Sequence, residues 1–489
     1  RDGTPQVEAT LLPIGDNVRS LNIKYQNKGI MVSKKNKDKN DKYADIDICT
    51  FLKAITGMNE IELIQMFGFD NPFVLQAFNP DRKKQTEIKK ENFNLLDFGQ
   101  EFIAAFAVKF IETENEQLMS DYFAISNADQ IPDGYVSLVF TAHERPFEDF
   151  FNGATDVDRL NREATDEFIR ITHEKYKSAV GDLFGKEVLG IFVDEPHRGF
   201  LFGGADLDRM PYTYTLFETF ESYVGYDLKS HLPELFYKKV GESFNKTAYD
   251  YIDVLNKMFI ENFAKPYFDW CKKNNLILTG HIWEENNLVS QTRLSGSVQR
   301  YYEYMDYPGI DVLSHTLDTP WIAKQCYSVA KQLGKSCVLS ELYGCSGWQT
   351  RFEDYKRIGD WQAVLGVNFR CHHLSWYTMQ GEAKRDYPAS IFYQSAWFDK
   401  YKYVEDYFSR FNYVLSLGKS VTDVAVVNPI ESAWGLVRKG CFYNCDAMYS
   451  DMQKLEQDYE DTFYALTDGG VDFDYIDEDI LSRHGMLTD

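Results

Sequence analysis

The sequence predicts an α/β fold of the (β/α)8 or TIM-barrel type. From about residue 135, short apolar runs alternate six times with longer helix-like segments, which is the pattern of parallel strands joined by right-handed crossovers. Each run ends in or near His, Asp, Glu or Trp. A doubly wound sheet usually gathers its ligand groups at one switch point, so polar residues at consecutive strand ends favour a closed barrel.

Residues 1–130 differ from the rest of the chain, and we interpret them as a β-rich module or an insertion. Short alternating runs such as 18–25 predict β-hairpins, and 102–110 predicts a longer strand. The six predicted strand–helix units leave an eight-stranded barrel two strands short. We therefore expect a barrel that is incomplete at its N-terminus, or one whose first strands lie within or upstream of this region.

The barrel region is assigned to residues 131–418. Asn161 precedes an amphipathic segment and is expected to cap that helix, because an asparagine side chain accepts hydrogen bonds from the first free N–H groups. Strands are predicted at 135–140, 188–195, 276–281, 310–314, 337–341 and 367–373. Helical segments are predicted at 161–180, 213–274, 321–333 and 352–365.

The pattern restarts after Gly418, and we interpret residues 419–489 as the start of a second α/β domain. A strand predicted at 421–429 is followed by a helix at about 446–466 and by a strand at 471–476. Because this segment is too short for an independent sheet, we expect the domain to be truncated.

Composition limits the classes of partner. The 489-residue chain carries a net charge of -23, spread along its length. Nucleic acids and anionic membranes bind basic patches, so we expect neither as a partner. The eight cysteines show no metal or disulfide framework, which favours a cytoplasmic location. Because the chain starts at Arg1 without Met, a secreted or periplasmic protein that lacks its signal segment here is the alternative.

Two glutamates at predicted strand ends are the candidate catalytic residues. Glu195 follows the apolar run 190–193, and Glu341 has the same place after 337–340. Cleavage of a glycosidic bond takes two carboxyl groups, one to protonate the leaving oxygen and one to attack the anomeric carbon or activate water. Asp194 is expected to raise the pKa of its neighbour Glu195 through like-charge repulsion, which suits a general acid near neutral pH.

Polar and aromatic side chains near the predicted strand ends are expected to bind the substrate. Carboxylates and imidazoles hydrogen-bond sugars, and Trp and Tyr rings stack on them. Adjacent residues on a strand face opposite sides, so only one of His372 and His373 is expected to face the site. The expected substrate-binding residues are Asp194, His143, His281, Trp283, Glu284, Glu285, His315, Trp348, His373 and Tyr377.

This scheme requires no cofactor, although a calcium ion near the adjacent acids Glu284 and Glu285 is an alternative, since hard cations prefer carboxylate oxygens. Zinc is not expected, because the sequence has no HExxH-type helix. The sequence also has neither a G-x-x-x-x-G-K-[ST] phosphate loop nor a G-x-S-x-G nucleophile elbow, which disfavours nucleotide hydrolysis and serine-hydrolase chemistry.

A series of short motifs runs through about residues 135–489. They lie at 172–176, 184–185, 190–196, 340–344, 360–361, 366–368, 373–377, 387–390, 394–397 and 470–476. Together they resemble bacterial glycoside hydrolases related to family 106, the α-L-rhamnosidases. The resemblance implies a barrel followed by a flavodoxin-like domain, removal of terminal rhamnose with inversion, and a calcium ion near the site. It also implies that Glu195 is the general acid and Glu341 the base or a key substrate-site carboxylate.

The sequence leaves three alternatives open. In a retaining, β-galactosidase-like glycosidase Glu341 would be the nucleophile, and a carboxyl separation of about 5 Å rather than roughly 6.5–9.5 Å would identify it. A non-catalytic carbohydrate-binding protein would suit the aromatic share of 16%. A lyase or metal-dependent hydrolase would use Glu284, Glu285 and a histidine around calcium. The expected partner is a glycoside or an oligosaccharide, and a homo-oligomer is left open.

Overall fold

The computed structural model describes residues 102–485 apart from 114–116, 145–150, 152, 204–207, 381–386, 440 and 443–449, and it also describes four strands before residue 100. The chain divides into two compact units, residues 1–68 with 204–206 and residues 69–203 with 207–489. In the first unit, an antiparallel sheet of three strands has the order β1 (Val7–Pro13), β2 (Val18–Tyr25), β3 (Lys28–Lys35). The strand predicted at 18–25 is β2.

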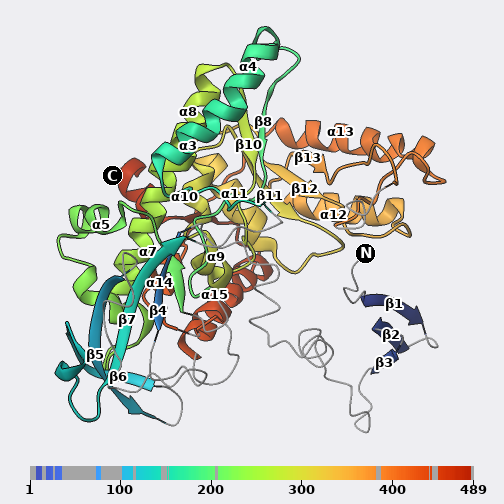
Figure 1. Ribbon diagram of the computed structural model, residues 1–489. Helices are drawn as coiled ribbons and strands as arrows, with labels where there is room; N and C mark the ends of the chain where they lie inside the picture. Colours follow the sequence, from blue (N-terminus) through green and yellow to red (C-terminus); the bar gives the residue numbers. More distant parts are fainter. Residues whose placement is uncertain are drawn as a thin grey trace. The chain divides into compact units, whose positions relative to one another are not determined.

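The centre of the second unit is a curled parallel sheet of five strands (Figure 1). Strands that follow one another along the chain are neighbours in this sheet, as in the wall of a barrel. Five of the six predicted strands are thereby confirmed, and within the described residues they form a half-barrel rather than a closed eight-stranded barrel. The order is β13 (Phe369–His372), β12 (Leu339–Leu342), β11 (Tyr307–Val312), β10 (Ile277–Gly280), β8 (Gly190–Val193).

The prediction that residues 135–140 form the first strand of the barrel is wrong, because this segment belongs to an antiparallel sheet. Leu138, Val139 and Phe140 are all buried. Both faces of the strand are therefore covered, and its sequence is as continuously apolar as that of a parallel strand. The sheet has the order β6 (Gln117–Ala124), β5 (Phe102–Glu112), β7 (Val136–Glu144), β4 (Phe73–Phe78), β9 (Arg209–Pro211).

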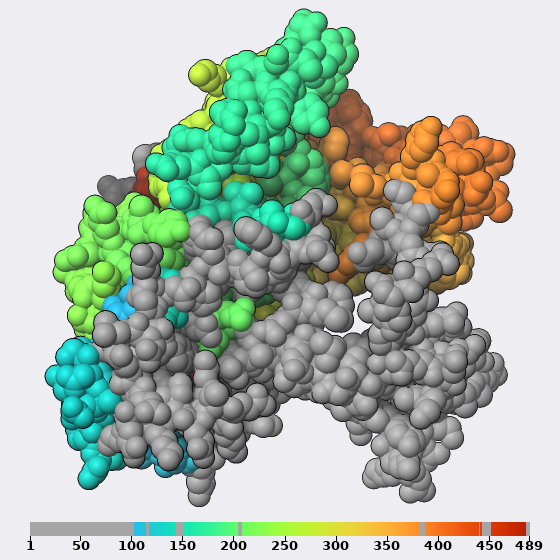
Figure 2. All heavy atoms as spheres, in the orientation of Figure 1, coloured from blue at the N-terminus to red at the C-terminus, as the bar shows by residue number. Residues whose placement is uncertain are grey.

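Helices connect the parallel strands as predicted. Asn161 caps α3 (Arg162–Phe168) by accepting a hydrogen bond from the N–H of Glu163 at 2.9 Å, which confirms that expectation. The space-filling view shows α3 with α4 in green and α12 with α13 in orange at the surface of this unit (Figure 2). A search of the described helices finds none with the length and apolar character needed to cross a bilayer. The helices that follow α3 are α4 (Glu174–Val180), α5 (Leu216–Val224), α6 (Leu232–Phe236), α7 (Lys246–Phe259), α8 (Lys265–Lys273), α9 (Leu288–Leu294), α10 (Val298–Tyr302), α11 (Pro320–Gln332), α12 (Phe352–Val364) and α13 (Lys402–Ser416).

The C-terminal segment begins with the strand and helix pattern predicted for it. The parallel pair β14 (Ala425–Val427) and β15 (Asp474–Ile476) confirms the two predicted strands, and α15 (Ser450–Asp468) confirms the long helix. Two shorter helices complete the segment, α14 (Ile430–Trp434) and α16 (Glu478–His484). Residues of β15 and α15 belong to the same hydrophobic core as β10 and β11, so the segment packs as a continuation of the half-barrel.

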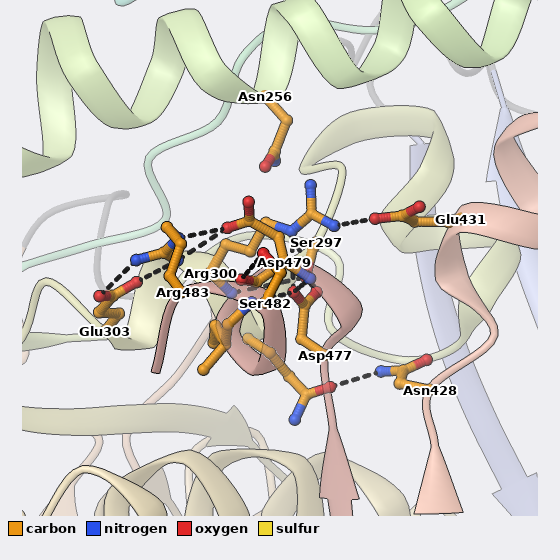
Figure 3. Close-up of polar contacts among 12 residues, drawn as sticks. Asn256, Ser297, Arg300, Glu303, Asn428, Glu431, Asp477, Asp479, Ser482 and Arg483 are labelled. Atoms are coloured by element: carbon orange, nitrogen blue, oxygen red, sulfur yellow. Dashed lines mark hydrogen bonds and ion pairs between the residues drawn. The ribbon is translucent and has the colours of Figure 1, made fainter. Parts of the chain in front are cut away.

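A buried arginine on α10 joins this segment to the half-barrel (Figure 3). The guanidinium of Arg300 donates to Asp477 at 3.0 Å and to Asp253 at 3.2 Å, and it also pairs with Glu431. The Arg300 side chain is 4% exposed, and it lies 5.0 Å from the centre of the Trp434 ring. Because a buried charge persists only when it is paired, this cluster fixes how α14 and α16 pack on α10.

Candidate active site

The carboxyl ends of four neighbouring parallel strands bring acidic side chains and an imidazole together. Asp194 and Glu195 follow β8, and His281 follows β10. Asp311 and Glu341 lie on β11 and β12, and the sheet register pairs them directly. Because parallel strands all end at the same edge of a barrel, residues from separate parts of the sequence meet there.

The tips of β8 and β10 approach each other closely. Gly280 has a φ of +127°, and a Cβ added to it would lie 2.0 Å from the carbonyl oxygen of Val193. Glycine is the residue that tolerates both this backbone conformation and this approach. Since Val193 and Gly280 pair in the sheet register, the contact sets the spacing between the residues that follow them, Asp194 and His281.

His281 lies at the centre of the acidic group. Its Nε2 atom is 2.8 Å from Oε2 of Glu341 and 3.3 Å from Oδ1 of Asp194. The imidazole is fully buried, and burial disfavours its charged form. The hydrogen bonds to Asp194 and Glu341 outweigh burial and raise the pKa of His281 well above its usual value. A protonated His281 therefore donates to these carboxylates, and the hydrogen bond from His281 lowers the pKa of Asp194.

Glu195 combines an unusual backbone conformation with a raised pKa. Its φ of +49° lies in the left-handed region, which a residue other than glycine rarely adopts and which clusters at functional sites. Burial raises the pKa of Glu195 to about 7, and the charge of His281 opposes this rise. Repulsion by Asp194 acts in the predicted direction, although burial is the larger cause. Near neutral pH the Glu195 carboxyl therefore carries a proton in much of the population.

Asp311 is a second carboxyl with a raised pKa, and the sequence interpretation missed it. An oxygen of Asp311, an oxygen of Glu195 and a nitrogen of His281 all lie within 4.8 Å of one another. Burial raises the pKa of Asp311 to about 8, against the effect of His281. Because Glu195 and Asp311 lie close together, we expect them to titrate as a pair. An acid inside the predicted strand 310–314 was the signal that could have identified it.

The adjacent acids Glu284 and Glu285 have different surroundings. Glu285 is buried and accepts hydrogen bonds from the Tyr302 hydroxyl and, at 3.0 Å, from the N–H of Asp311. Burial raises the pKa of Glu285 to about 7. Each of its oxygens thus accepts one hydrogen bond. His281 belongs to both groups of potential metal ligands at these strand ends, whereas calcium prefers oxygen ligands.

A cavity of about 200 Å³ opens beside these acids. Glu195 and Asp311 line one part of it, and the loop that follows β10 lines the rest. Glu341 is not among the lining residues, although its neighbour in the sheet register, Asp311, is one of them. The cavity is lined by Glu195, Ile282, Trp283, Glu284, Glu285, Asn286, Asp311 and Leu313.

Two more expected binding residues lie near this group, and one does not join it. Nε2 of His373 is 3.9 Å from Oε1 of Glu341. Trp283 lines the cavity and packs edge-on against Phe200. His315 instead contacts the carbonyl oxygen of Ser346 at 3.2 Å.

The remaining expected residues lie on β7 and in the loops that follow β12 and β13. His143 lies on β7, where its backbone pairs with Val74 in the antiparallel sheet, so its expected place at a barrel strand end is wrong. Trp348 is 44% exposed and lies with its ring 5.5 Å from that of Trp376. Tyr377 is 96% exposed.

Comparison with known proteins identifies the family. Residues 140–435 match the family model of glycoside hydrolase family 106, described as alpha-L-rhamnosidase. A Formosa agariphila protein that carries beta-glucuronidase as a provisional name is 25% identical over 279 residues, which are 55% of this chain and 22% of that protein. The rhamnosidase of Novosphingobium sp. PP1Y has a similar fold, with a TM-score of 0.50 and 20% identity over 75% of this chain and 35% of that one.

The chain thus spans about a fifth of the curated relative and about a third of the rhamnosidase structure. The family model, in contrast, matches more than half of this chain and includes β8, β10, β11, β12 and β13. The chain belongs to glycoside hydrolase family 106.

Proposed function

We propose that the protein is a rhamnosidase-like glycosidase that removes a terminal sugar, with Glu195 as its general acid. The observation that carries the proposal is the position of Glu195 in the wall of the cavity, with burial raising its pKa to about 7. A general acid works best when its pKa lies near the operating pH. Membership of family 106 supports the reaction class, and the name of the Novosphingobium relative supports rhamnose as the sugar.

In this proposal the second carboxyl is Glu341. His281 donates to one of its oxygens at 2.8 Å and so orients it. Glu341 then acts as the base that activates water, or as the nucleophile if the enzyme retains configuration. The anomer released first, followed by proton NMR during hydrolysis, decides between the two roles.

Rhamnose fits the charge of the site better than a glucuronide does. Asp194, Glu195 and Glu341 outnumber the two imidazoles near them, His281 and His373. A sugar carboxylate would add another negative charge to this group, and like charges repel strongly where water is excluded. We therefore expect hydrolysis of aryl α-L-rhamnosides and little hydrolysis of aryl β-D-glucuronides, which a substrate panel checks.

The test of the proposal compares substitutions that remove one carboxylate each. We expect Glu195→Gln and Glu341→Gln to lower kcat on an aryl α-L-rhamnoside by about 10²–10⁴-fold, because each removes a proton donor or acceptor. Glu353→Gln is the matched control, since the Glu353 side chain is 77% exposed on α12. Wild-type activity in Glu195→Gln would contradict the assignment. Sugar binding in calorimetry without turnover would instead indicate a carbohydrate-binding protein.

A further inference from the structure

We infer that Glu456, on α15 of the C-terminal segment, is a positioning residue for the loop that lines the active-site cavity. The inference rests on the proposed function, because it concerns the same site. Helix α15 lies outside the residues that the family model matches. In the sequence, 167 positions separate Glu456 from its partner Val289, so the contact exists only in the folded chain.

Glu456 accepts hydrogen bonds from two backbone N–H groups at the start of α9. Its Oε1 atom lies 3.2 Å from the nitrogen of Leu288, and its Oε2 atom lies 3.0 Å from the nitrogen of Val289. The first N–H groups of a helix have no acceptor within the helix. The side chain of Asn287 caps the next N–H, that of Ser290, at 2.7 Å. A carboxylate from a distant helix thus completes the cap at the point where the loop joins α9.

An aromatic cluster links α15 to the same loop at a second point. The indole N–H of Trp321, on α11, donates to the carbonyl oxygen of Asn286 at 2.5 Å, and Asn286 lines the cavity. Trp321 is 3% exposed and packs edge-on against Tyr459 and Phe463 of α15. Helix α15 therefore supports the end of the loop through a carboxylate and through an aromatic ring.

The supported loop carries side chains that line the same cavity as Glu195. Trp283, Glu284 and Glu285 lie within six residues of Val289 and line the cavity. The side chain of Gln291, on α9, also donates to the carbonyl oxygen of Glu285 at 3.2 Å. A shift of the first turn of α9 would move these groups relative to Glu195. Misplacement of about 1 Å can cost roughly 100-fold in rate even when the change lies far from the reacting atoms.

The experiment measures kcat and KM on an aryl α-L-rhamnoside together with amide hydrogen exchange in residues 281–294. Glu456→Gln keeps one acceptor oxygen, and Glu456→Ala keeps none. We expect kcat to fall by about tenfold and about a hundredfold respectively, and exchange in 281–294 to become faster in the same order. KM should change less than kcat, because binding groups on other loops are unchanged. Glu460→Gln, which removes the same charge from the same helix, should behave like wild type.

Two outcomes overturn the inference. One is a folded Glu456→Ala protein with the kinetics and exchange of wild type. The other is faster exchange with unchanged kcat, since the loop would then be supported without consequence for catalysis. The exchange measurement needs no substrate. If wild type does not hydrolyse the rhamnoside, the proposed function fails, while faster exchange in 281–294 of Glu456→Ala still supports the positioning role.

Discussion

At the scale of single residues, His281 balances the charge of the site. It contacts Asp194 and Glu341 directly and is the neighbour that lowers the pKa of Glu195. Without it, three carboxyl groups would lie together with little compensation, and their charged forms would be disfavoured. His281, which the sequence suggested as a sugar ligand, contacts two acids with its buried imidazole.

The pH dependence of activity follows from these neighbours. Glu195 acts as an acid only when protonated, so kcat/KM should fall as the pH rises through about 7, the value to which burial raises its pKa. His281→Gln removes the charge that lowers this pKa. We expect the alkaline limb of the pH profile to move to higher pH by on the order of one unit, with a lower maximal rate because Glu341 loses its hydrogen bond.

His484→Gln is the control for this profile, because His484 lies on α16 and pairs with Glu303 at the end of α10, whereas His281 contacts Asp194 and Glu341. A limb at the same pH in His281→Gln and wild type would show that Glu195 and His281 are not coupled.

Sequence patterns identified the residues at strand ends better than those inside strands. Asp194, Glu195, His281 and Glu341 all stand where an apolar run stops, and the structure brings them together. Asp311 and Tyr302 were missed. Tyr302 lies on the short helix α10, and nothing in its local sequence indicates that its hydroxyl reaches Glu285.

At the scale of secondary-structure elements, the approach of β8 to β10 decides the geometry of the site. Gly280→Ala would place a methyl group 2.0 Å from the carbonyl oxygen of Val193 at a φ of +127°. We expect a loss of roughly 2 kcal/mol or more in the free energy of unfolding. We also expect a loss of kcat in the folded protein, because Asp194 and His281 follow these two residues and would be displaced.

Denaturant unfolding and kcat measured on Gly280→Ala check this expectation. Gly241→Ala is the matched control, since Gly241 also has a positive φ, +80°, but has no atom within 4 Å of an added Cβ. Equal losses of unfolding free energy and kcat in the two variants would contradict the role of the close approach, because the positive φ alone would then explain the effect.

The apolar pattern of the sequence predicted which segments form buried strands. It did not predict whether a strand pairs with parallel or antiparallel neighbours, because both kinds of buried strand have the same pattern. Residues 310–314 are apolar because both faces of a parallel strand are covered. Leu138, Val139 and Phe140 of β7 are apolar and buried as well, yet the strands beside them run antiparallel. Strand direction depends on distant partners, and the sequence of β7 does not encode it locally.

At the scale of the whole chain, each compact unit has sheets of its own, and in the larger unit the half-barrel and the C-terminal segment share one core. The cluster around Arg300 is one of the polar parts of that contact (Figure 3). Asp253, Glu431 and Asp477 come from three helical regions far apart in sequence. Neither the spacing of these residues nor their local sequence predicts that they meet.

Arg300→Met tests the importance of this contact. The substitution keeps much of the side-chain length but leaves Asp477 and Glu431 without the guanidinium, whereas Asp253 keeps its pair with Lys257. Breaking a buried ion pair in this way should lower the free energy of unfolding by about 3–5 kcal/mol. Hydrogen exchange should become faster first in 471–484. Arg162→Met, in an exposed pair with Asp166, should leave both measurements unchanged, and a similar lack of effect in Arg300→Met would contradict the role of the cluster.

The role of Glu195 as proton donor is tested most directly by varying the leaving group. A sugar with a poor leaving group needs a proton from the acid, whereas a strongly activated aryl group departs without one. We predict that Glu195→Gln loses at least about 100-fold in kcat/KM on an alkyl α-L-rhamnoside and far less on a dinitrophenyl α-L-rhamnoside. Equal losses on the two substrates, or no loss on either, would contradict the assignment of Glu195 as the general acid.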